Sequence, residues 1–248
     1  MLPTPLEFER AGLKAWPGVE VDWDGTWVRR ASNGYSKRAN SAQCFDPADD
    51  DNAPHRVAEA CRWFEERGLP AVFRVNLLTG PNLTAALDSA NWDTIDHSRL
   101  MAMELPELSP DPRGEVRGVH DPEFLDVQRR LKNASDEEMA GLGAILAVLE
   151  VPAVGIVLRA EDGRAVASAL MAVADRIVIT GNVVTDTHER RKGYAAAMMR
   201  TGLAWAAMEG ARFAALNVAA DNEAGLALYR SLGYRPQYDY AYRVARSP

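Results

Sequence analysis

A short basic turn carries the residue types in this chain that could do chemistry. Arg190, Arg191 and Lys192 stand directly before Gly193, and an Ala-, Met- and Leu-rich run follows over residues 195–209. Apolar residues recur in that run at helical spacing, so the turn leads into a helix N-terminus. Such a terminus presents unpaired N–H groups and a partial positive charge that suit a phosphate, and glycine lets the backbone approach an anion closely. The turn therefore predicts an anion site, although an ordinary surface turn can carry the same residues.

A strand before the turn and a strand and helix after it must hold the turn in place. β-branched residues at 177–179 and 183–184 predict the first strand. Residues 213–218 predict the second strand, and residues 222–232 predict a helix that Gly233 ends.

Two segments together resemble the GNAT superfamily of N-acetyltransferases. The pattern Arg190-x-x-Gly193-x-Ala195 is similar to its (Gln/Arg)-x-x-Gly-x-(Gly/Ala) signature. Residues 222–234, Asn-Glu-Ala-Gly-Leu-Ala-Leu-Tyr-Arg-Ser-Leu-Gly-Tyr, are similar to its Asn-x-x-(Ala/Gly)-x-x-Leu-Tyr-x-x-Leu-Gly-(Phe/Tyr) segment. The resemblance begins near Glu115 and covers roughly 130 residues, the size of one domain. It implies an enzyme that uses acetyl-coenzyme A as cosubstrate and acetylates a primary amine by direct attack in a ternary complex.

The resemblance also implies which residues hold the cosubstrate. The turn would bind the pyrophosphate, and the strand before it would splay at a bulge, suited by polar Asn182, and bind the pantetheine arm with its free backbone groups. A backbone N–H there could also stabilise the oxyanion. The expected contacts are Val183, Val184, Thr185, Arg190, Arg191, Lys192, Gly193, Tyr194, Ala195, Ala196 and Asn222. Asn222 could equally cap its helix. Thr187 in place of Pro and Ala195 in place of the commoner Gly depart from the family pattern, and Tyr194 is bulky.

Tyr229 is the candidate catalytic residue. A phenol with a pKa of about 10 holds a proton at neutral pH and can give it to a leaving thiolate. The alternative is that Tyr229 only packs its helix on the sheet. The general base is not identified: Glu150, Asp186 and His188 are candidates, as is a chain of waters.

The two halves of the chain match as an internal repeat, although chance agreement between two αβ halves with few identities is the alternative. Gly68 and Gly210 lie 142 positions apart, and at that offset a helix–strand–helix–strand order occurs twice in register. The first copy places acidic residues 48–51 over the basic turn, where they would repel a pyrophosphate. We therefore expect one cofactor per chain, held in the second half.

The expected architecture is an α/β (α+β) GNAT fold, with a mixed central β-sheet flanked by helices and two tandem GNAT-like halves. A Pro-rich linker at 106–114 separates a degenerate GNAT-like domain (1–110) from the acetyl-coenzyme A-binding domain (114–248). Further predicted helices span residues 6–16, 54–67, 83–90, 121–132 and 136–149. Further predicted strands span residues 19–21, 27–31, 35–42, 71–75, 94–105, 153–159, 165–173 and 234–244.

Composition excludes several other classes of protein. A net charge of −7 disfavours nucleic acid as a partner. No apolar run approaches the roughly 20 residues of a membrane span, and the N-terminus lacks a signal-peptide pattern, so we expect a cytoplasmic protein without a membrane partner. Cys44, Cys61 and the scattered histidines form no disulfide or metal pattern, so no metal is expected.

Two functions remain open from the sequence. The first is an N-acetyltransferase acting on a small-molecule or peptide amine, as a monomer or homodimer. The alternative is a non-catalytic sensor or scaffold that binds acyl-coenzyme A. A nucleotide-dependent oxidoreductase would need a Gly-x-Gly-x-x-Gly turn, which the chain lacks.

Overall fold

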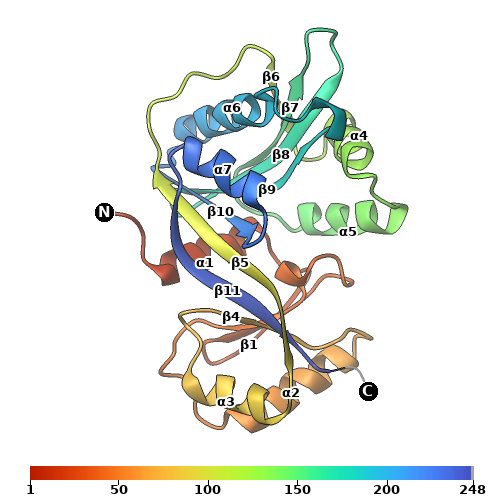
Figure 1. The fold of residues 1–248 in the computed structure, drawn as a ribbon. Helices are drawn as coiled ribbons and strands as arrows, with labels where there is room; N and C mark the ends of the chain where they lie inside the picture. Colours follow the sequence, from red (N-terminus) through yellow and green to blue (C-terminus); the bar gives the residue numbers. More distant parts are fainter. Residues whose placement is uncertain (247–248) are drawn as a thin grey trace.

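The computed structural model describes residues 1–246, and their strands form one mixed sheet (Figure 1). The strand order is β1-β2-β3-β4-β11-β5-β10-β9-β8-β7-β6. The strands are β1 (Glu20–Asp24), β2 (Trp27–Ala31), β3 (Ala42–Cys44), β4 (Val72–Val75), β5 (Asp93–Glu104), β6 (Gly114–Gly118), β7 (Ala153–Arg159), β8 (Ala165–Ala174), β9 (Ile177–Thr185), β10 (Phe213–Ala219) and β11 (Arg235–Val244). The helices are α1 (Pro5–Ala15), α2 (Ala53–Glu65), α3 (Pro81–Ser89), α4 (Pro122–Lys132), α5 (Asp136–Ala147), α6 (Tyr194–Met208) and α7 (Glu223–Ser231), with 3-10 turns η1 (Lys37–Ala39) and η2 (Thr187–Glu189). The predicted mixed sheet flanked by helices is confirmed.

The internal repeat is visible in the element boundaries. Helices α3 and α7 begin and end 142 residues apart, and strands β5 and β11 begin 142 residues apart. Helices α2 and α6 and strands β4 and β10 overlap at the same offset. The two halves are therefore built from the same order of elements.

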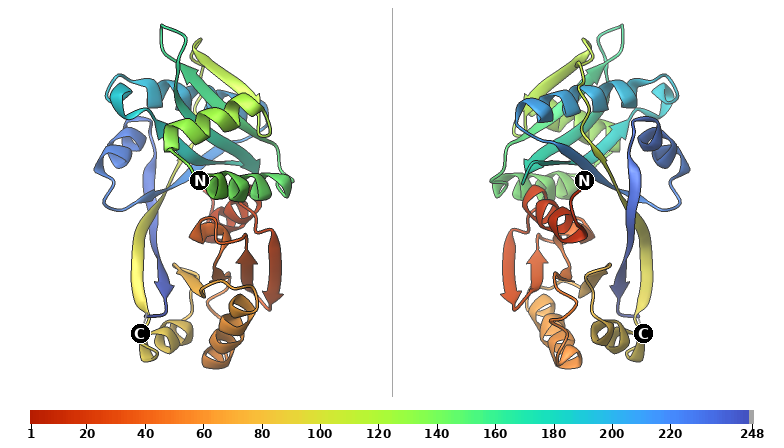
Figure 2. Two further views of the ribbon diagram at one scale, coloured as in Figure 1. Left: turned by 90° about the vertical axis from the view of Figure 1, so that its right-hand side faces the viewer. Right: turned by 90° about the vertical axis from the view of Figure 1, so that its left-hand side faces the viewer.

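The halves exchange their last strands. Strand β4 of the first half pairs with β11, and strand β10 of the second half pairs with β5, all antiparallel. Strands β5 and β11 also pair with each other, and they run side by side between the two halves (Figures 1 and 2). Residues 105–113 join β5 to β6 without regular structure, where the linker is predicted. The domain boundaries stay a prediction, but three strand pairings cross them.

A buried ion pair connects α1 to the strands where the two halves meet. The Glu9 carboxylate accepts hydrogen bonds from Arg74 of β4 (2.8 Å), Gln43 of β3 (2.7 Å) and Tyr238 of β11 (2.9 Å). Glu9 and Arg74 are both buried. One carboxylate therefore fixes the positions of one helix and three strands.

We expect Glu9→Ala to lower the free energy of unfolding by about 3 to 5 kcal/mol, because it leaves the buried Arg74 charge unpaired. Denaturant unfolding measures this loss. The double variant Glu9→Leu with Arg74→Met should recover most of it, since apolar side chains then replace both charges. Equal stability of Glu9→Ala and the wild type would show that the pair does not hold the halves together.

One sequence prediction in the sheet was wrong, and one strand was missed. Residues 35–42 do not form one return strand; they contain η1, and strand β3 begins only at Ala42. The Asn40 side chain accepts from the Ser32 N–H (2.7 Å) and donates to the Tyr35 carbonyl (2.9 Å), so it satisfies backbone groups that a strand ladder would use. Strand β6, which pairs with β7, was not predicted at all.

Candidate functional site

Strand β9 carries a bulge and then separates from β10. Ser168 of β8 faces Val184, whereas Leu170 faces Gly181, so two β9 residues oppose one β8 residue. The extra residue is Asn182, in the left-handed region with φ of 51°. Parallel pairing between β9 and β10 ends at Thr180, although both strands continue.

The separation leaves one edge of β9 without a strand partner. Val184 and Thr185 stay paired to β8 on the other side. Val183, Val184 and Thr185 are all half-buried. Their β10-facing edge can therefore take an extended ligand as a missing strand. The bulge expected at Asn182 is confirmed.

The basic turn forms the N-terminus of α6. Gly193 is its N-cap, with φ of 81°, and no atom lies within 4 Å of the position of an added Cβ. The first helical hydrogen bond runs from the Ala197 N–H to the Gly193 carbonyl (3.0 Å). The N–H groups of Tyr194, Ala195 and Ala196 thus have no acceptor within the helix, which is what an anion requires.

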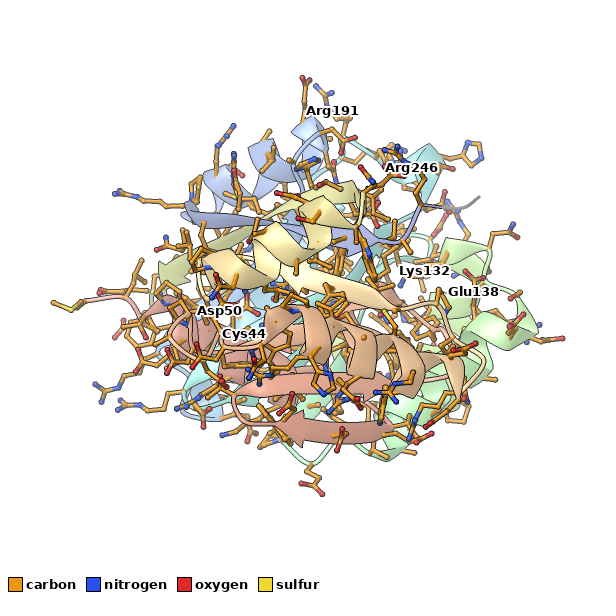
Figure 3. All side chains as sticks on the ribbon, turned by 90° about the horizontal axis from the view of Figure 1, so that it is seen from below. Cys44, Asp50, Lys132, Glu138, Arg191 and Arg246 are labelled. Atoms are coloured by element: carbon orange, nitrogen blue, oxygen red, sulfur yellow. The ribbon has the colours of Figure 1, made fainter. Side chains whose placement is uncertain are left out.

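The charged side chains of the turn divide into two groups. Lys192 donates to Glu189 at 2.8 Å, and Arg164 donates to the other Glu189 oxygen at 3.0 Å. The hydrogen bond from Lys192, followed by that from Arg164, lowers the pKa of Glu189. Arg190 and Arg191 are exposed and make no ion pair with any residue in 1–246, and Figure 3 shows Arg191 at the periphery. These two arginines have guanidinium groups available for a ligand.

Helix α7 places Asn222 and Tyr229. The Asn222 side chain accepts from the Gly225 N–H at 2.9 Å, so Asn222 is the N-cap of α7. Tyr229 is 7% exposed and stacks edge-on against Tyr234, with ring centroids 6.0 Å apart. Burial raises the pKa of Tyr234, and the neighbouring Thr180 hydroxyl acts in the opposite direction, although the two hydroxyls do not form a hydrogen bond of normal geometry. Thr180 is the last β9 residue paired to β10. The Tyr234 ring therefore lies between Tyr229 and the point where the strands separate.

Burial raises the pKa of Tyr229 to about 12. The folded value lies above the ordinary value of about 10, so the protonated form is favoured in the native state. The stability from this group is complete below about pH 10 and is lost as the pH rises toward 12. We expect the free energy of unfolding to fall from about pH 8 to about pH 11, and to fall less in Tyr229→Phe. Urea unfolding at the two pH values measures this; identical pH slopes in the two proteins would contradict the assignment.

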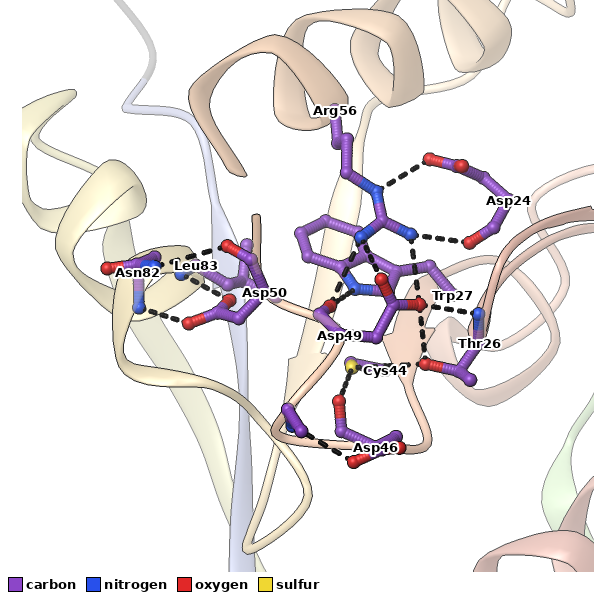
Figure 4. Close-up of polar contacts among 11 residues, drawn as sticks. Asp24, Thr26, Trp27, Cys44, Asp46, Asp49, Asp50, Arg56, Asn82 and Leu83 are labelled. Atoms are coloured by element: carbon purple, nitrogen blue, oxygen red, sulfur yellow. Dashed lines mark hydrogen bonds and ion pairs between the residues drawn. The ribbon is translucent and has the colours of Figure 1, made fainter. Parts of the chain in front are cut away.

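The corresponding turn of the first half, residues 48–51, is filled by its own carboxylates (Figure 4). Asp50, which corresponds to Lys192, is buried and accepts from the backbone N–H groups of Asn82 and Leu83, the latter at 2.9 Å. These N–H groups belong to the first turn of α3, where an anion would bind. The chain therefore supplies its own anion at this helix terminus.

Asp49, in the same turn, is also fixed by hydrogen bonds within the first half. Its carboxylate accepts from Arg56 (2.8 Å) and from the Thr26 N–H (2.7 Å), and the hydrogen bond from Arg56 is the main cause that lowers its pKa to about 2. The acidic turn is thus a structural element of the first half.

The structure does not gather the three candidate bases into one site. Asp186 accepts from the His188 backbone N–H at 2.9 Å and caps η2. His188 and Glu150 are exposed. The general base stays unidentified.

A cavity of about 760 Å³ lies between the halves, at the carboxyl end of β10. Its walls come from η1, β5, β11 and the residues that follow the last β9–β10 pair, and Arg38 and Asn217 line it. This volume suits a small molecule. Sequence reasoning missed Arg38 and Asn217, because neither residue lies in a motif.

Known structures with GNAT acetyltransferase folds are similar over nearly the whole chain. A GCN5-related N-acetyltransferase from Kribbella flavida superposes with a TM-score of 0.70 at 18% identity, covering 98% of this chain and 94% of that one. A tandem GNAT protein from the clavulanic acid biosynthesis pathway superposes with a TM-score of 0.66 at 12% identity, covering 99% of this chain and 89% of that one. At these identities the likeness establishes the fold, including tandem GNAT-like halves.

A match to a family model over most of the chain establishes the family, and a sequence relative agrees with it. The N-acetyltransferase YobR of Bacillus subtilis is 25% identical over 247 residues, 97% of this chain and 98% of its own length. Residues 6–243 match the family model described as "Probable histone acetyltransferase Rv0428c C-terminal", so the chain belongs to this family of GNAT acetyltransferases. The expected enzyme class, a GNAT-type N-acetyltransferase, is confirmed.

Two other features are absent from the part of the chain that the structure describes. Within residues 1–246, no helix combines the length and apolar character that crossing a bilayer requires. The same residues contain no group of three His, Cys, Asp or Glu side chains placed to hold a metal ion.

Proposed function

We propose that this enzyme transfers the acetyl group of acetyl-coenzyme A to a primary amine by direct attack within a ternary complex. The observation that carries the proposal is that the open edge of β9 is followed directly in the chain by a basic helix N-terminus. An extended polar chain that ends in a pyrophosphate would fit both features. The family supports this donor, and acetyl-coenzyme A supplies an acetyl thioester that an amine can attack.

The contacts predicted from the sequence keep their roles in this proposal. Val183, Val184 and Thr185 offer the unpaired edge, and the N–H groups of Tyr194, Ala195 and Ala196 face the anion. Arg190 and Arg191 add free positive charge. Lys192, held by Glu189, helps to fix the shape of the turn, and Asn222 keeps only its amide N–H₂ for a ligand.

Tyr229 is the proton donor in this proposal. Its phenol stays protonated at neutral pH because burial raises its pKa to about 12. Within residues 1–246 no other group shares its hydroxyl proton through a hydrogen bond, so the proton remains available to a thiolate that leaves at the strand separation.

The acceptor amine would enter through the cavity between the halves. The cavity begins where β9 and β10 part, so an amine in it can approach the open β9 edge. The family description names histones; whether this chain acetylates a protein or a small molecule is decided by the acceptor test below. The division into a degenerate first domain (1–110) and a cofactor-binding domain (114–248), and a cytoplasmic location, remain proposals of the sequence.

Initial-rate kinetics test the direct-attack mechanism. Thiol release is measured while acetyl-coenzyme A and an accepted amine are varied together. Intersecting reciprocal plots are expected, because both substrates must be bound before reaction. Parallel plots would indicate a covalent acetyl-enzyme and would refute direct attack.

A further inference from the structure

Arginine side chains from the first half gather beside the strand separation. A small cavity next to the larger one is lined by Arg30 of β2, Arg38 of η1 and Arg74 of β4, with Glu9 as its carboxylate. Arg38 and Asn217 line both cavities, so the two are adjacent. Three guanidinium groups thus face one carboxylate.

The one carboxylate does not satisfy the buried arginines. Arg74 is 3% exposed and donates a hydrogen bond to Glu9, and its guanidinium carbon lies 3.4 Å from the ring centroid of Tyr240. Its Nη1 has no hydrogen-bond partner. Arg30, 2% exposed, donates Nη1 to the neutral Trp16 carbonyl at 3.1 Å, and its Nε has no partner. Burial, together with the positive charges of Arg74 and Arg38, lowers the pKa of Arg30 to about 10. Buried donors without partners are costly, and an oxyanion would satisfy them.

Arg38 is the arginine placed to meet a ligand. It is half-buried, its guanidinium lies 4.8 Å from the Trp16 ring centroid, and it pairs with no carboxylate among residues 1–246. Its Nη1 lies 3.6 Å from where a Cβ on Gly181 would be, directly beside the bulge of β9. Neighbouring Lys37 differs, because Asp96 neutralises it at 2.9 Å. Arg38 is therefore the cation of the larger cavity that no carboxylate neutralises; the exposed Asp221 also lines this cavity and makes no ion pair within residues 1–246.

Asn217 adds a second unpartnered polar group at the same place. It is the first β10 residue beyond the last β9–β10 pair, and its side-chain oxygen is buried without a hydrogen-bond partner. An amide oxygen accepts from an amine N–H. The cavity thus offers a cation for an anionic group and an acceptor for an amine.

We propose that the acceptor is a small primary amine that also carries an anionic oxyacid group, which Arg38 binds while Asn217 receives the amine. This inference rests on the proposed acetyl transfer and specifies its substrate class. A guanidinium fork matches carboxylate and phosphate alike, so both sources of the anion fit the site. A lysine-rich peptide would bring like charge to Arg38 and fits less well.

Binding of anions without an amine tests the site independently of catalysis. Isothermal titration with succinate and with inorganic phosphate should show saturable binding of at least one, and neutral succinamide should show none. Arg38→Gln keeps the packing stem but loses the charge and should weaken binding at least about 10-fold. The double variant Lys37→Gln with Asp96→Asn removes a complete ion pair from the same cavity without changing its net charge and should leave anion binding nearly unchanged. The stronger of the two anions identifies the source. No saturable binding, or equal binding in Arg38→Gln, overturns the proposal.

Turnover tests the substrate class. With the wild type, kcat/KM for β-alanine or 2-aminoethylphosphonate should exceed that for β-alaninamide and for a lysine-rich peptide at least about 10-fold. Arg38→Gln should remove this preference with KM for acetyl-coenzyme A unchanged, and Arg38→Lys should restore part of it. Equal or better use of the neutral amine or the basic peptide overturns the inference and leaves acetyl transfer standing. Arg38-dependent anion binding without thiol release from any amine overturns the proposed function and leaves the anion site standing.

Discussion

Tyr229→Phe is expected to lower kcat by about 10²- to 10⁴-fold while KM for acetyl-coenzyme A changes little. The substitution removes one hydroxyl from a ring that is 7% exposed, and phenylalanine fills the same space. What is lost is the proton that the thiolate receives, since burial holds the Tyr229 pKa at about 12. Thiol-release kinetics at saturating acetyl-coenzyme A measure the effect.

Tyr234→Phe is the matched control for this variant. Tyr234 packs against Tyr229, and its hydroxyl is buried without a hydrogen-bond partner. Removing that hydroxyl costs no hydrogen bond, so activity should be kept and stability should be equal or greater. If the two variants lose activity equally, Tyr229 acts through packing and is not the acid.

Gly193→Asp is expected to weaken acetyl-coenzyme A binding at least about 100-fold while the chain stays folded. The added carboxylate stands at the N-terminus of α6, where it takes the place of the ligand's pyrophosphate, as Asp50 does at α3. The space around Gly193 is open, so the only folding cost is the left-handed φ of 81°. Calorimetric titration measures the affinity, and circular dichroism checks the fold.

Gly68→Asp controls for backbone strain and for the added charge. Gly68 follows α2 with φ of 66°, and its Cβ position is also free of neighbours. This variant should bind acetyl-coenzyme A like the wild type. Near-wild-type affinity in Gly193→Asp, or equal loss in both variants, would refute the phosphate-binding role of the turn.

The sequence predicted the parts of the site that depend on local patterns. Apolar residues recur at helical spacing over residues 195–209 and predicted a helix there; α6 spans Tyr194–Met208. The bulge was expected from the family resemblance, and the polar Asn182 agreed with it; the structure places Asn182 in the left-handed region with φ of 51°. The offset of 142 residues predicted equivalent elements such as α3 and α7.

Long-range arrangement could not be predicted in the same way. Strands β5 and β11 were both expected, but a pattern within a strand does not say which strand it pairs with. Arg38 approaches Gly181 from a loop that Asn40 holds, and no spacing links residues so far apart in the chain. The cavity exists only because the two halves meet, so the acceptor side of the site came from the structure.

The corresponding turns of the two halves differ in charge, which supports the proposal that only the second half binds the cofactor. In the first half, Asp50 turns away from the helix that follows its own turn and accepts from the N–H groups of α3, the counterpart of α7. In the second half, Lys192 stands at the position of Asp50, and the first N–H groups of α6 have no acceptor within the helix. The first half contributes instead a wall of the cavity, through η1 and β5. This division of roles predicts one molecule of acetyl-coenzyme A per chain.

The most direct test of the account is the coupling of thiol release to acetylation of an amine. Purified protein is mixed with acetyl-coenzyme A and a panel of primary amines, and both free thiol and acetylated amine are quantified. We expect them to appear in equal amounts, with release depending on both substrates. Saturable binding of acetyl-coenzyme A without thiol release from any amine would contradict the account and favour a non-catalytic acyl-coenzyme A-binding module.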